Sequence, residues 1–145
     1  MYTKMLLDVV DALNKVSYKK YGCNIKSTII NMKKNTPLSQ WNSHPTFLYQ
    51  TDRAIYLSGL RNNIGHGAAV AASVTVEDIC VILKVAAVAL FDRDKRYSVY
   101  LREANSDCYV CFNGEKKYDI DYLCKQFRRT KDSHWLVKEI FAWHL

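Results

Sequence analysis

The run from Ile79 to Leu90 constrains the fold more than any other part of the chain. It is almost wholly apolar, and Lys84 is its one charged residue. Thr75-Val76-Glu77-Asp78 comes just before it, with the threonine-to-acid spacing of a capping box, which predicts a helix start. A helix that is apolar on every side has to be covered on every side. We expect a second subunit to supply part of that cover. The alternative is that the C-terminal segment of the same chain covers the helix.

The composition is typical of a globular protein with a sizeable core. The 145 residues are 49% apolar and 24% charged. No apolar run reaches the roughly 18 residues of a membrane-spanning helix, and charges interrupt the N-terminus too early for a secretory signal. Five scattered cysteines favour reduced thiols over a disulfide framework. We therefore expect a cytoplasmic protein with no membrane partner.

Four helices are expected in the first two thirds of the chain. Residues 3–21 carry apolar side chains at spacings of three and four, which predicts an amphipathic helix. Residues 24–35 show a weaker helical pattern, and residues 36–50 look irregular because two prolines lie among turn-forming residues. Residues 51–65 form the third predicted helix, with Thr51 or Asp52 as its cap. The fourth is the apolar helix described above.

The pattern changes after residue 92. Alternating residues and the turn pair Asn113-Gly114 predict a small meander or hairpin over 96–121. Residues 133–144 form a last predicted helix, with Ser133 as a possible cap. The predicted fold class is mainly α, with a helical bundle over residues 1–92 and a small β-containing α+β appendage over residues 93–145.

Residues 57–67 hold the candidate chemistry. They read Leu-Ser-Gly-Leu-Arg-Asn-Asn-Ile-Gly-His-Gly. The guanidinium of Arg61 fits a phosphodiester, and His66 titrates near neutral pH and can move a proton beside it. Asn62 lies four positions from His66, on the same face of a helix, and can orient the reacting group. The alternative is a capped helix end, in which Arg61 and His66 bind carbonyls and Asn63 lies in a turn.

The stretch Leu60-Arg61-Asn62-Asn63-Ile64-Gly65-His66-Gly67 resembles the signature of the HEPN superfamily, in which a histidine follows an arginine after four to six residues. It is most similar to the abortive-infection C-terminal type. Two leading helices, a motif helix and a trailing apolar helix also match the four-helix bundle of that superfamily. The resemblance covers about residues 1–92.

The resemblance implies a metal-independent endoribonuclease that acts as a toxin or antiviral effector. Arg61, Asn62 and His66 would be its catalytic residues, with no cofactor and no metal. It also implies RNA as substrate, a homodimer with a composite cleft, and an antitoxin or defence-system partner. Two alternatives stay open: a catalytically silent HEPN-like module that binds RNA or a partner, and a helical adaptor.

Basic residues elsewhere are candidates for RNA contact. The net charge of +7 favours polyanions, although it also serves solubility. Several cations of the C-terminal segment lie among aromatic residues, a combination that can hold backbone and stack bases. With Asn63, the predicted RNA-binding residues are Lys116, Lys117, Arg128 and Arg129. The alternatives are a solvated surface, a cover over the cleft, or an antitoxin contact.

Cys108 and Cys111 form a Cys-x-x-Cys pair, with Cys124 and His134 downstream. Zinc needs four convergent ligands, whereas two residues three apart on a strand point to opposite faces. We therefore expect two ordinary half-buried thiols and no metal.

Overall fold

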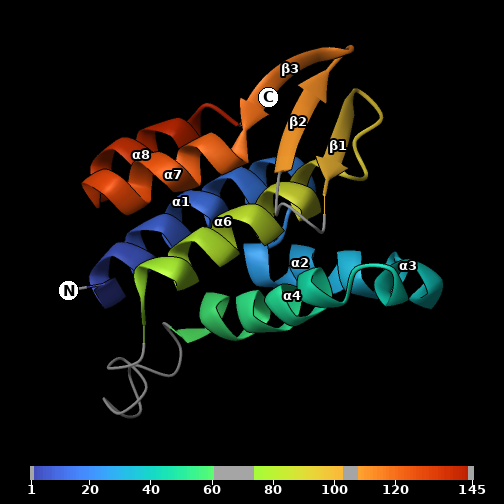
Figure 1. Cartoon of the computed structure of the whole chain (residues 1–145), viewed down its shortest axis with the longest axis horizontal. Helices are drawn as coiled ribbons and strands as arrows, with labels where there is room; N and C mark the ends of the chain where they lie inside the picture. The colour runs from blue at the N-terminus through green and yellow to red at the C-terminus, as the bar shows by residue number, and fades with distance from the viewer. Residues whose placement is uncertain (1, 61–73, 103–107, 144–145) are drawn as a thin grey trace.

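The computed structural model describes residues 2–60, 74–102 and 108–143. Within these ranges the chain is mainly helical, with one small antiparallel sheet (Figure 1). The elements in chain order are α1 (Tyr2–Tyr21), α2 (Ile25–Asn35), α3 (Leu38–Asn42), α4 (Pro45–Ser58), α6 (Val76–Phe91), β1 (Tyr97–Leu101), β2 (Cys108–Phe112), β3 (Glu115–Asp119), α7 (Ile120–Thr130) and α8 (Ser133–Phe141).

Helices α1 and α2 confirm the first two predictions. The apolar positions of α1 are buried in the core, with Leu6, Val9 and Leu13 fully covered. The helix ends at Tyr21, and the φ of +72° at the following Gly22 suits glycine because it has no side chain. Asn24 then caps α2, since its side-chain oxygen accepts a backbone N–H of the first turn at 2.8 Å.

The prediction of an irregular segment over residues 36–50 is wrong. Helix α3 and the first turn of α4 lie within it, and α4 begins at Pro45, where a missing N–H is no loss. Thr51 therefore lies inside α4 instead of capping it, and its hydroxyl donates a hydrogen bond to the Phe47 carbonyl at 2.8 Å. The stacked rings of Trp41 and Phe47, 5.7 Å apart, hold α3 against α4.

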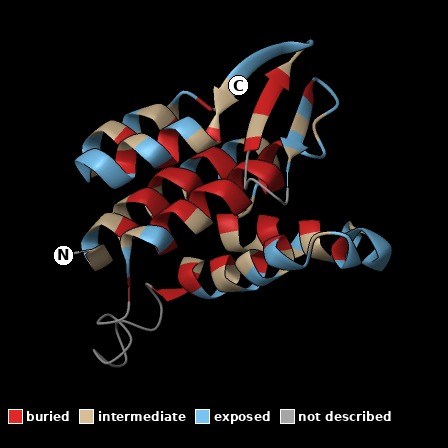
Figure 2. Cartoon of the chain, viewed as in Figure 1, coloured by how far each residue is buried: buried red, intermediate tan, exposed pale blue. Residues whose placement is uncertain are grey.

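Helix α6 lies at the centre of the fold (Figure 2). Thirteen of its 16 residues are buried, and α1, α2, α4, α7, β1 and β2 all contact it. The capping box is confirmed, because Asp78 N–H donates to Thr75 Oγ1 at 3.2 Å and Thr75 N–H donates to the Asp78 carboxylate at 3.0 Å. The chain thus covers its apolar helix itself, partly with its C-terminal segment. The apolar run is therefore no reason to expect a dimer.

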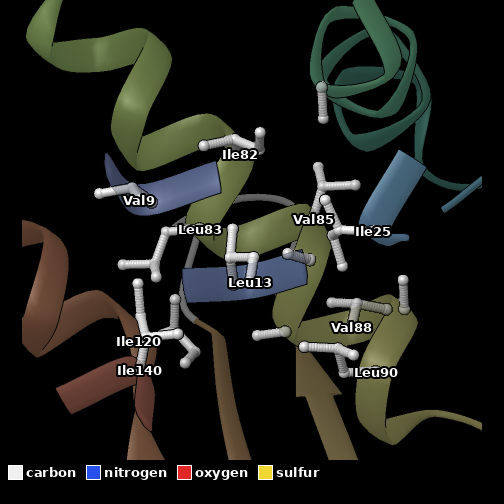
Figure 3. Packing of buried hydrophobic residues seen from close by; sticks show 14 of the residues in the cluster. Val9, Leu13, Ile25, Ile82, Leu83, Val85, Val88, Leu90, Ile120 and Ile140 are labelled. Carbon is white, nitrogen blue, oxygen red and sulfur yellow. The ribbon is translucent and has the colours of Figure 1, made fainter. Parts of the chain in front are cut away.

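Residues from both sides of position 92 share one hydrophobic cluster. Figure 3 shows Val9 and Leu13 of α1 and Leu83 of α6 near Ile120 and Ile140 of the C-terminal segment. Helix α8 packs along α1, and α7 packs along α6. Burying an isoleucine side chain stabilises a fold by about 1.5–3 kcal/mol, so the C-terminal helices contribute to the same core as the bundle.

The predicted meander is confirmed as a three-stranded sheet in the order β1-β2-β3. Strands β2 and β3 are joined at Asn113 and Gly114, whose φ values are 51° and 86°. Positive φ at both positions is what a tight two-residue hairpin turn requires.

The end of the chain differs from the prediction in two ways. Residues 120–130 form α7, where no helix is predicted, and Asp119 caps it by accepting Tyr122 N–H at 3.0 Å. Helix α8 is capped by Asp132 and not by Ser133, since Asp132 Oδ1 accepts Trp135 N–H at 3.0 Å. Of the helices in the described ranges, none combines the length and the apolar character needed to cross a membrane.

Candidate functional site

The motif segment begins inside the described part of the chain and continues beyond it. Leu57 and Leu60 are buried, and so is Val74, where the description resumes. The predicted catalytic residues Arg61, Asn62 and His66, together with Asn63, lie outside the described residues. What the structure shows is therefore how the two flanks of this segment are held.

Both flanks lie at the same end of the helical bundle. Helix α4 ends at Ser58 and α6 begins at Val76, and these two ends lie side by side (Figure 1). A two-pronged ion pair joins them, because Arg53 donates from Nε to Asp78 Oδ1 at 3.1 Å and from Nη2 to Asp78 Oδ2 at 3.0 Å. Parallel contacts of this kind are among the strongest hydrogen bonds in proteins and fix orientation. The flanks are thus held at a defined separation.

The electrostatics of Asp78 follow from these contacts. Burial acts to raise the pKa of its carboxyl group, but the hydrogen bonds from Arg53 and from the Thr75 backbone outweigh burial and lower the pKa below its usual value. The same contact raises the pKa of Arg53. Asp78 is therefore a charged structural anchor at the start of α6.

A second arginine holds the same turn of α6 from the other side. Arg128 of α7 donates to the Glu77 carboxylate from Nε at 2.7 Å and from Nη2 at 3.1 Å, and this contact raises its pKa. The first turn of α6 is thus attached to α4 through Asp78 and to α7 through Glu77. Arg128, predicted to bind RNA, already has a carboxylate partner inside the chain.

The other predicted RNA-binding cations are also engaged, and they do not form one site. Lys116 pairs with Asp119 at 2.8 Å, Lys117 lies over the Phe112 ring at 5.7 Å, and Arg129 Nη2 donates to Gln126 at 2.6 Å. The two lysines are on β3, which precedes α7, whereas the two arginines lie in the last turn of α7. The length of α7 therefore separates the two pairs.

The cysteines occupy the interior. Cys108 and Cys111 are both buried in β2, not half-buried as expected, and the strand has a bulge between Val110 and Cys111. Burial raises the pKa of Cys108 to about 12. Cys124 lies against Cys80 of α6, and each thiol contacts the backbone carbonyl of the other at 3.8–3.9 Å. Among the residues that the structure describes, no three His, Cys, Asp or Glu side chains converge as metal ligands.

Comparison of the chain with models of protein families, with curated proteins and with solved structures gives no match. The functional argument therefore rests on the motif residues and on the geometry of their flanks.

Proposed function

We propose that this chain is a HEPN-like, metal-independent endoribonuclease. The observation that carries the proposal is the Arg61–His66 spacing in a segment that connects α4 to the buried helix α6. In this proposal α1, α2, α4 and α6 form the HEPN-like bundle, and the paired flanks present the motif at its end. The proposal is supported by the Arg53–Asp78 and Glu77–Arg128 pairs, which hold the start of α6 against two neighbours.

The proposed reaction is an internal transesterification. The ribose 2′-oxygen attacks the adjacent phosphorus while the bond from phosphorus to the 5′-oxygen breaks, which leaves a 2′,3′-cyclic phosphate and a 5′-hydroxyl. His66 removes the proton from the 2′-hydroxyl or supplies one to the leaving oxygen. Arg61 stabilises the charge on the phosphorane. Asn62 orients the reacting group, and Asn63 contacts the RNA.

The biological role we propose is that of a toxin or antiviral effector. It acts in the cytoplasm, where its unpaired cysteines stay reduced, and it is controlled by an antitoxin or a defence-system partner. In this proposal two copies pair so that their motifs form one cleft. The support for the homodimer is the resemblance, since α6 is already covered within one chain.

The test is RNA cleavage in the presence of a chelator. Wild type is compared with Arg61→Ala and His66→Ala, prepared in parallel, and with Arg102→Ala and His134→Ala as matched controls on exposed residues. We expect wild type and both controls to cleave and both motif variants to lose at least about a hundredfold in rate. Equal cleavage by wild type and both motif variants contradicts the proposal. If wild type binds RNA but does not cleave it, the chain is the silent binding module instead.

A further inference from the structure

A basic hollow lies at the opposite end of α6 from the motif flanks. Helices α1 and α6 run in the same direction, and their C-terminal ends meet (Figure 1), where the Tyr21 hydroxyl donates to the Leu90 carbonyl at 2.6 Å. Beside this contact the surface forms a hollow of about 560 Å³. It is lined by Lys19, Lys20, Tyr21, Arg93, Asp94, Lys95 and Arg96.

The inner part of this hollow is structural. Asp94 accepts hydrogen bonds from Lys20 Nζ and from Arg96 Nη2, both at 2.8 Å. The Lys20 side chain is only 5% exposed, and its ammonium lies 5.2 Å from the Phe91 ring and 5.3 Å from the Tyr97 ring. These contacts hold the C-terminal end of α1 against the start of β1. They also neutralise the negative charge of Asp94 within the protein.

The outer part offers cations to a ligand. Lys19, Arg93 and Lys95 are exposed, and Lys19 and Lys95 have no ion pair within the described ranges. The Arg93 guanidinium lies 5.0 Å from the Tyr21 ring and forms a planar, positively charged part of the lining. Lys19 and Lys95 differ in this respect from Lys116, Arg128 and Arg129, each of which has a polar partner in the chain.

The charge of the hollow exceeds what the fold needs. Its five cations are balanced by Asp94 in the lining and, counted with them, by Asp92 next to Arg93 in the sequence, which leaves a net of +3. The two helix C-termini together account for about one further negative charge. About two positive charges are left over, and an anionic ligand is the group that would match them.

We propose that this hollow binds the phosphate backbone of single-stranded RNA, as a second contact surface remote from the motif. This inference rests on the proposed function, which makes RNA the relevant polyanion. The 16 residues of α6 separate the hollow from the motif flanks by about 24 Å. An RNA that reaches both needs about seven nucleotides if the strand is stacked with the ~3.4 Å axial rise per phosphate of a helical strand.

The experiment measures binding of an RNA of about 12 nucleotides, well above that span. All of its riboses are 2′-O-methylated, so the protein cannot cleave it, and affinity is followed by fluorescence anisotropy over a series of salt concentrations. Lys19→Gln/Lys95→Gln removes two outer cations. Lys34→Gln/Lys138→Gln is the matched control, since it removes the same charge from two exposed lysines that, like Lys19, lie in the last turns of helices.

We expect the Lys19/Lys95 variant to bind about tenfold more weakly and its log–log salt slope to fall by about 1.4, which is the loss of two phosphate contacts on a single strand. The control variant keeps the affinity and the slope of wild type. Thermal unfolding of both variants checks that they fold.

The proposal is overturned if wild type and the Lys19/Lys95 variant bind the RNA with equal affinity. It is also overturned if the Lys34/Lys138 control loses as much affinity as the Lys19/Lys95 variant, or if wild type does not bind the RNA. The nuclease proposal fails separately. If wild type cleaves RNA but the hollow variant binds normally, the hollow is not an RNA surface and the nuclease stands. If wild type binds through the hollow and never cleaves, the surface stands and the nuclease falls.

Discussion

Arg53 of α4 and Asp78 of α6 form a two-pronged ion pair that joins the helix before the motif segment to the helix after it. The two residues are 25 positions apart, and the whole motif lies between them. The pair is partly shielded, with the Arg53 and Asp78 side chains 30% and 12% exposed. It therefore joins the two helices that flank the candidate motif in the sequence.

Breaking this pair is expected to destabilise the fold. Asp78→Asn leaves the Arg53 guanidinium without its anion and weakens the cap of α6, so we expect a loss of about 2 kcal/mol in the free energy of unfolding. Lys4→Ala breaks the Lys4–Asp8 pair, whose lysine side chain is 83% exposed, and should cost less than about 0.5 kcal/mol. Urea unfolding at neutral pH measures both. Equal effects of the two variants would contradict the role given to Asp78.

The stability should fall in acid in a way that depends on Asp94. Hydrogen bonds from Arg96 and Lys20 hold the pKa of Asp94 well below its usual range. A carboxyl group whose pKa is lowered by folding contributes stability above its unfolded pKa of about 3.9, and that contribution is lost as pH falls through the folded pKa. Asp94→Asn should therefore be less stable than wild type at pH 7, and the difference should shrink as the pH falls below about 3.9. Denaturant unfolding across this range measures it, and a difference that stays constant or grows in acid would refute the assignment.

Replacing Lys131, the residue that follows α7, by glycine is expected to stabilise the fold. Lys131 follows α7 with φ 52° and ψ 35°, a left-handed conformation that costs an ordinary side chain roughly 1 kcal/mol. Lys131→Gly should raise the melting temperature. Thr130→Gly, one position earlier and inside the helix, should lower it because glycine is a poor helix former. A decrease in both variants would show that α7 does not end as described.

The thiols should differ in reactivity according to burial. Cys108 is 1% exposed and burial raises its pKa to about 12, so almost none of it is thiolate at pH 8. Cys23 is partly exposed. Alkylation of the native protein at pH 8, followed by peptide mass spectrometry, should modify Cys23 first and Cys108 only after denaturant is added. Early modification of Cys108 would place β2 outside the core.

The sequence was sufficient for α1, α2, α6 and the meander because each has a clear local signal: a helical repeat, a capping box or a two-residue turn. Helix α4 begins earlier than predicted because Pro45 does not break the helix but lies at its first position, where the missing N–H is no loss. The signal for α7 was also present, since its buried residues Ile120, Leu123, Cys124 and Phe127 follow helical spacing. The meander predicted over residues 96–121 overlaps the start of α7.

The remaining features depend on contacts between distant residues. Local pattern shows that α6 needs cover but not that α4, α7 and the sheet supply it, so a dimer and a self-covered helix could not be told apart. The basic hollow combines Lys20 with Asp94, 74 positions away. Of the candidate site, Arg128 could be recognised as basic, but its Glu77 partner lies 51 positions away.

The most direct test of the central claim is the chemistry of the cleaved ends. RNA treated with the wild-type protein in excess chelator is analysed by mass spectrometry, and the mapped cleavage site is then blocked by one 2′-O-methyl group. We predict fragments with 2′,3′-cyclic phosphate and 5′-hydroxyl ends, no cutting at the methylated position, and no cutting by His66→Ala. Absence of cleavage in chelator, or cutting that persists at the methylated position, would contradict the account.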